Sequence, residues 1–80
     1  MKFEMFGRVA FAVDMPDRQI QKGDIATVIE YFDDPEPGYA LEVFNALGET
    51  VDVLTASETE LEALREDQVI HVRRIEAKVL

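Results

Sequence analysis

Short segments of alternating apolar and polar residues fill much of this chain, and Gly, Pro or Asn residues separate them. A period of two is typical of a β-strand with one buried face. The first such segment runs from about Gly7 to Val13. The same pattern predicts strands over residues 39–43 and 50–54.

Residues 25–32 have a different pattern, because both sets of alternate positions are apolar or β-branched apart from Glu30. A strand of this kind is expected to be covered on both faces, in the middle of a sheet. A long loop precedes it, in which the lone apolar residue Ile20 is expected to tuck inward. Gly23 supplies the positive φ that a sharp chain reversal needs.

Two further loops are predicted from turn residues. Residues 33–38 contain two prolines, which cannot continue a strand, so we expect the most exposed loop there. Residues 45–48 begin with Asn and end with Gly, which is typical of a tight hairpin with a left-handed residue.

The periodicity changes at Thr55. Ser57 and Glu60 have capping-box spacing, which predicts one or two helical turns over residues 58–65. Residues 69–73 alternate again and are predicted to be the strand that closes the barrel. Residues 75–80 fit helix and strand spacing equally well, and we leave both open.

This order of segments predicts a mainly β fold, a small SH3-like barrel of about five strands with one short helical turn before the last strand. A chain of 80 residues has room for a single domain, residues 1–80, and for one small core. A large catalytic cleft is hard to build at this size. We expect a cytoplasmic protein without a membrane span, because neither a signal peptide pattern nor a run of eighteen apolar residues is present.

A family resemblance is carried by Asp14-Met15-Pro16-Asp17, by residues 22–30 and by Leu41-Glu42-Val43-Phe44-Asn45. With these motifs the chain resembles the bacterial family called domain of unknown function 4926, with most similarity over residues 9–57. The resemblance implies a small SH3-like domain without established catalytic residues. It also implies a protein-binding role, since some members are encoded beside larger or toxin-like proteins. The core Gly-Asp-x-x-Thr-Val also resembles the KOW type of nucleic-acid and ribosome-associated barrel.

Charge weighs against nucleic acid as the main ligand. The net charge is −9, and residues 1–67 hold 16 acidic against 5 basic side chains. Binding to a phosphate backbone needs clustered Lys or Arg residues. The nucleic-acid alternative therefore depends on Arg73, Arg74 and Lys78 near the C-terminal end.

Catalytic chemistry has little support in the sequence. The chain contains no cysteine and a single histidine, His71, for which a surface position is expected. Asp33 and Asp34 are adjacent, so on an extended chain their side chains point apart. Loop carboxylates of this kind are more often solvated than bound to a cation. We therefore expect a protein that is not an enzyme and that uses no cofactor or metal.

The loop over residues 33–38 carries the densest group of carboxylates, and aromatic residues flank it. Core packing of Tyr31 and Tyr39 competes with a role as a binding platform. Phe44 breaks the alternation of its strand, so we expect it to be exposed or to lie at a bulge. Phe3, Phe6 and Phe11 are expected in the core. The predicted partner-binding residues are Tyr31, Asp33, Asp34, Glu36, Tyr39 and Phe44.

The sequence thus favours a non-enzymatic domain that binds a protein with a basic face. An accessory, immunity-like or antitoxin-like partner of a neighbouring protein is the leading hypothesis. The alternatives are a KOW-like nucleic-acid or ribosome-associated module and a small structural homodimer that pairs through an edge strand.

Overall fold

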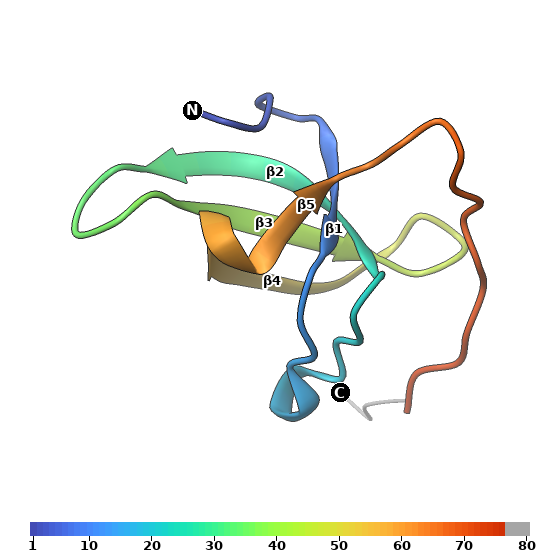
Figure 1. The fold of residues 1–80 in the computed structure, drawn as a ribbon. Coiled ribbons are helices and arrows are strands. Elements are labelled where there is room, and N and C mark those ends of the chain that lie inside the picture. Colours follow the sequence, from blue (N-terminus) through green and yellow to red (C-terminus); the bar gives the residue numbers. More distant parts are fainter. Residues whose placement is uncertain (77–80) are drawn as a thin grey trace.

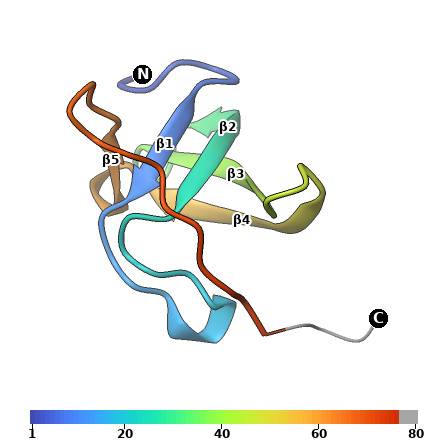
Figure 2. The ribbon, with the colours of Figure 1, turned by 90° about the vertical axis from the view of Figure 1, so that its right-hand side faces the viewer.

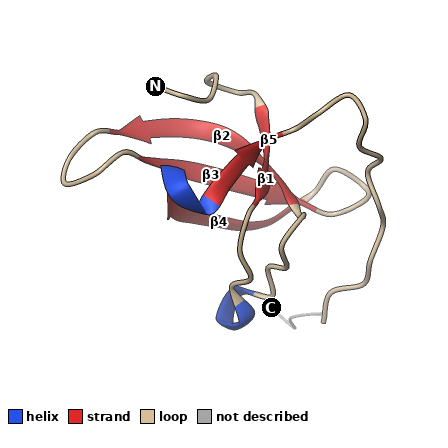
Figure 3. Ribbon diagram, in the orientation of Figure 1, coloured by secondary structure: helices blue, strands red, loops and turns tan. Residues whose placement is uncertain are grey.

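The computed structural model describes residues 1–76 and consists of strands, two short 3-10 helices and loops (Figures 1 and 3). The elements are, in chain order, β1 Arg8–Phe11, η1 Pro16–Arg18, β2 Ile25–Phe32, β3 Gly38–Phe44, β4 Thr50–Ser57, η2 Glu58–Glu60 and β5 Leu61–Ala63.

All strand pairs are antiparallel and form one sheet in the order β4-β3-β2-β1-β5. The prediction of a mainly β fold with five strands and a short helical turn before the last strand is confirmed. In Figure 1, β1 and β5 run steeply across β2, β3 and β4, so the sheet bends over on itself. Buried side chains of all five strands pack into one core.

The core forms because β1, β2 and β3 each send large apolar side chains to the same side of the sheet. Val9 and Phe11 of β1, Val28 of β2, and Tyr39 and Leu41 of β3 are its most buried large side chains. Burying such side chains contributes about 1.5–3 kcal/mol each to folding, before the entropy cost of ordering them. The core therefore fixes the positions of the loops at both ends of these strands.

β2 has the predicted bounds but not the predicted double coverage. Ala26 and Val28 are buried, whereas Ile25, Thr27 and Ile29 on the other face are only partly covered. The sheet is a single layer in the part of the chain that the structure describes, so one face of β2 has no second layer to pack against.

The β1–β2 loop, residues 12–24, follows the sequence prediction closely. Ile20 is buried beneath the loop, and Met15 and Ile20 pair through backbone hydrogen bonds. Gly23 has a φ of 94° where the chain turns into β2. A side chain at this φ would be strained, which explains the glycine.

Of two predicted elements, one is shorter than expected and one is wrong. Residues 58–65 begin with the predicted helical turn, but only Glu58–Glu60 form it, as η2, because Leu61 leaves the turn to pair with Phe11 of β1 in β5. Residues 69–73 form no strand, because β1 already pairs with β2 on one side and β5 on the other. Of residues 75–80, the structure describes 75 and 76, in neither helix nor strand, and residues 77–80 lie outside the described part.

The aromatic predictions divide in the same way. Phe3 and Phe11 are buried as expected. Phe6 is not in the core, since it is 73% exposed and has a φ of 64° in the turn before β1. Its backbone N–H donates to the Val28 carbonyl at 2.7 Å, so the turn is held by backbone bonds while the ring points away. Phe44 is exposed beside a register shift between β3 and β4, as predicted.

Candidate functional site

The predicted partner-binding residues gather mainly at the end of the sheet where β2 passes into β3. Asp33, Asp34 and Glu36 lie in the β2–β3 loop and are exposed. η2 packs beside this loop, and the Glu58 N–H donates to the Pro37 carbonyl at 2.9 Å. This contact brings five carboxylates to one end of the sheet. We call this group the acidic end, and it consists of Asp33, Asp34, Glu36, Glu58 and Glu60.

A shallow hollow of about 730 Å³ lies between the loop and η2. Phe32 and Pro35 supply apolar surface on the loop side, and Thr55 and Thr59 line the opposite side. Asp34, Glu36 and Glu60 also line the hollow. A ligand in this hollow would therefore meet apolar surface and several negative charges together.

The Tyr39 hydroxyl connects the hollow to the N-terminal segment. It donates to Oε2 of Glu58 at 2.7 Å and accepts from the N–H groups of Lys2 at 2.9 Å and Phe3 at 3.1 Å. Its ring packs on Phe3 with centroids 5.4 Å apart. Burial, together with the bond to Glu58, raises the pKa of Tyr39 above its usual value of 10.

Because the Tyr39 side chain is fully buried, the interpretation of Tyr39 as an exposed binding platform is wrong, and core packing is correct. Tyr31 is partly exposed and lies on Tyr39, with ring centroids 5.2 Å apart. Its hydroxyl donates to Oδ1 of Asp33 at 3.2 Å. Desolvation and this hydrogen bond raise the pKa of Tyr31. Tyr31 thus stays available at the rim of the acidic end.

Phe44 does not join this site. It lies at the opposite end of β3 from Gly38, roughly 20 Å away along a strand that rises about 3.3 Å per residue. Its 42% exposure makes it part of a different surface, beside the β3–β4 hairpin. The six predicted residues therefore belong to two places, and a partner of ordinary size would have to span the sheet to reach both.

The structure describes two of the three basic residues of the nucleic-acid alternative. Arg73 is bound to Asp24 in an ion pair, and Arg74 is exposed. Lys78 lies outside the described residues. His71 is exposed, as expected.

Sequence reasoning missed the partners that organise these regions, namely Glu58 below Tyr39, Asp24 beside Arg73, and Asp52 bound to Arg18. All these contacts join residues far apart in sequence. The capping box at Ser57 and Glu60, which is present, was the one available signal that η2 is fixed in place.

Among residues 1–76, no three His, Cys, Asp or Glu side chains are arranged to hold a metal ion. No helix in the same part of the chain has the length and apolar character needed to cross a bilayer.

Comparison with known proteins agrees with the motif-based resemblance. The model of the family described as domain of unknown function, DUF4926, matches residues 5–70. No curated protein and no solved structure matches the chain. The family match includes all five strands, and the loop and η2 that bound the hollow. The chain therefore belongs to the DUF4926 family.

Proposed function

We propose that this chain is a non-enzymatic, cytoplasmic protein-binding domain of SH3-like architecture. Its partner is a protein with a basic face, which it serves as an accessory, immunity-like or antitoxin-like subunit. The strand order, with a 3-10 turn before a short last strand that returns to β1, supports the SH3-like comparison.

One observation carries the proposal. The acidic end places carboxylates around a hollow that also offers the Phe32 and Pro35 side chains. Charge of one sign around a concave surface attracts a partner of the opposite sign and speeds its encounter. Apolar surface within the same hollow then contributes to the lifetime of the complex.

The acidic loop is also anchored firmly enough to act as a preformed surface. η2 is fixed by its capping box and by the Pro37 contact, and Tyr39 holds Glu58 from below. A surface that is ordered before binding loses less conformational entropy in the complex.

Affinity capture from the native host, with purified chain as bait, tests this proposal. The bait variant carries D33N, D34N and E36Q. The matched control carries D17N, E62Q and E66Q, three exposed carboxylates outside the acidic end, so both variants change the net charge equally. We expect the control to retain the partner and the acidic-end variant to lose it. Equal retention or equal loss by both folded variants would contradict the proposed site.

A further inference from the structure

After β5 the chain runs back along the molecule, as residues 64–76, to the β1–β2 loop (Figures 1 and 2). The segment forms neither helix nor strand, and four of its large apolar residues are exposed. These are Val69, Ile70, Val72 and Ile75. Apolar packing therefore does not explain its position, whereas polar contacts at residues 73–76 do.

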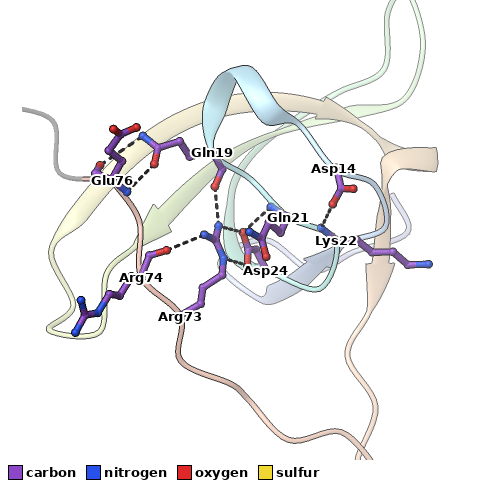
Figure 4. A network of polar contacts seen from close by, with 8 residues as sticks. All are labelled: Asp14, Gln19, Gln21, Lys22, Asp24, Arg73, Arg74 and Glu76. Atoms are coloured by element: carbon purple, nitrogen blue, oxygen red, sulfur yellow. Dashed lines mark hydrogen bonds and ion pairs between the residues drawn. The ribbon is translucent and has the colours of Figure 1, made fainter.

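Arg73 provides the main contact (Figure 4). Its Nε donates to Oδ1 of Asp24 at 2.9 Å, and its Nη2 donates to Oδ2 of the same carboxylate. Nη2 also donates to the Gln19 carbonyl at 2.6 Å. The Arg73 side chain is about three-quarters buried in this position. A two-pronged contact with a carboxylate fits arginine and not lysine, whose ammonium cannot present two parallel donors.

The Gln19 side chain binds the same segment again at Glu76, three residues after Arg73. Oε1 of Gln19 accepts from the Glu76 N–H at 2.7 Å, and Nε2 of Gln19 donates to the Glu76 carbonyl at 3.4 Å. Both backbone groups of one residue are thus held by one side-chain amide. This contact places no requirement on the side chain at that position.

The β1–β2 loop holds the receiving groups in place by bonds of its own. Oδ2 of Asp24 accepts from the Gln21 N–H at 2.8 Å, and the Phe11 N–H donates to the Asp24 carbonyl at 2.9 Å. Asp14 binds the Lys22 N–H at 2.8 Å, and Ile20 is buried beneath. A hollow of about 600 Å³ is lined by these loop residues and by Pro16, Arg73 and Arg74.

From these contacts we propose that the β1–β2 loop is a binding site for an extended peptide segment that carries an arginine. Asp24 and the Gln19 carbonyl take the guanidinium, and the Gln19 amide takes the backbone three residues beyond it. The chain's own residues 73–76 occupy the site as an internal competitor. The external ligand is an exposed arginine-containing segment of another protein. The site is separate from the acidic end and does not depend on the function proposed there.

The internal competitor sets how strongly an external segment binds. A tethered segment acts at an effective concentration in the millimolar range. The apparent affinity for an external peptide is the intrinsic affinity multiplied by the fraction of molecules in which the site is open.

The test uses the full-length chain and a fluorescent, end-blocked peptide, Ile-His-Val-Arg-Arg-Ile-Glu, which copies residues 70–76. Anisotropy titrations compare wild type, R73Q, and R65Q as the matched control. Arg65 makes an exposed ion pair with Asp67 away from this site. We expect R73Q to bind the peptide about tenfold more tightly than wild type or R65Q, because the site is no longer filled. Peptide binding by R65Q that is as tight as expected for R73Q, or an affinity of R73Q equal to that of wild type, would contradict the proposal.

Two further titrations assign the contact. D24N added to R73Q should abolish binding, and a peptide with R73K should bind R73Q about tenfold less tightly than the arginine peptide. If the double variant loses its β-type circular dichroism signal, the affinities of R73Q for the arginine and lysine peptides test the proposal instead. Equal affinity for both peptides would overturn the arginine site. A wild-type dimer that disappears in R73Q would show tail exchange between two copies, and would also overturn it.

Discussion

Arg18 and Asp52 form a two-pronged ion pair on the edge of β4, with Nε to Oδ2 at 2.9 Å and Nη2 to Oδ1 at 2.7 Å. The two side chains also bind both backbone groups of Val53. Its carbonyl accepts from Arg18 Nη2 at 2.9 Å, and its N–H donates to Asp52 Oδ1 at 2.9 Å. Since β4 is at the edge of the sheet, Arg18 and Asp52 cover backbone groups that could pair with another chain.

We therefore predict that R18A increases self-association. It exposes the Val53 carbonyl on an edge that already presents the half-exposed Val51 and Val53 side chains. R65A removes the same charge from the exposed Arg65–Asp67 pair and is the control. Sedimentation velocity over a concentration series should show dimers of R18A at concentrations where R65A and wild type behave alike. If R18A sediments as R65A does, the ion pair has no role in protecting the edge.

The Tyr39 hydroxyl makes three hydrogen bonds, one of them with the buried Phe3 N–H, whereas the Tyr31 hydroxyl makes one long bond at the surface. Y39F should lower the free energy of unfolding by about 1–3 kcal/mol, because it leaves buried groups without a partner. Y31F should change it by less than about 0.5 kcal/mol. Urea unfolding followed by circular dichroism measures both. Equal effects would show that the Tyr39 network does not stabilise this end of the sheet.

The ion pair between Arg73 and Asp24 has a defined pH dependence. Burial would raise the pKa of Asp24, but hydrogen bonds from Arg73 and from the Gln21 N–H lower it below its ordinary value of 3.8. A lowered pKa in the folded state adds stability that is present above pH 3.8 and is lost as pH falls through the folded pKa. R73Q removes much of this effect.

The difference in unfolding free energy between wild type and R73Q should therefore stay constant from pH 7 to about pH 5. It should be about 1 kcal/mol, because the pair is partly exposed to solvent, and it should shrink as the pH falls further. Urea titrations at several pH values measure it. A difference that grows toward acid pH would contradict the assigned ion pair.

Local patterns predicted β2 with its bounds, the buried Ile20, the left-handed Gly23 and the capping box at Ser57. Each of these depends on residues close in sequence, so periodicity and turn chemistry suffice. The last strand could not be placed in this way. The sequence pattern predicts a helical turn over residues 61–63 and a strand over residues 69–73, and only the register of Leu61 with Phe11 shows that the first segment pairs with β1.

The candidate site shows the same division. The carboxylates of the 33–38 loop are visible in the sequence. Glu58 and Glu60 lie beside this loop only after the chain has folded. Tyr39 and Phe44 both belong to β3, yet the first is buried and the second is exposed after a register shift. The broken alternation at Phe44 indicates this irregularity, whereas the burial of Tyr39 depends on the packing of the folded chain.

The central claim is that the acidic end binds a basic partner, and association kinetics with the captured partner test it most directly. Wild type, the D33N/D34N/E36Q variant and the D17N/E62Q/E66Q control are compared by stopped flow at several salt concentrations. We predict that the acidic-end variant associates about tenfold more slowly at low salt and with a flatter salt dependence, while the control changes by less than about threefold. If both variants slow association equally, overall charge and not the acidic end directs binding, and the account is contradicted.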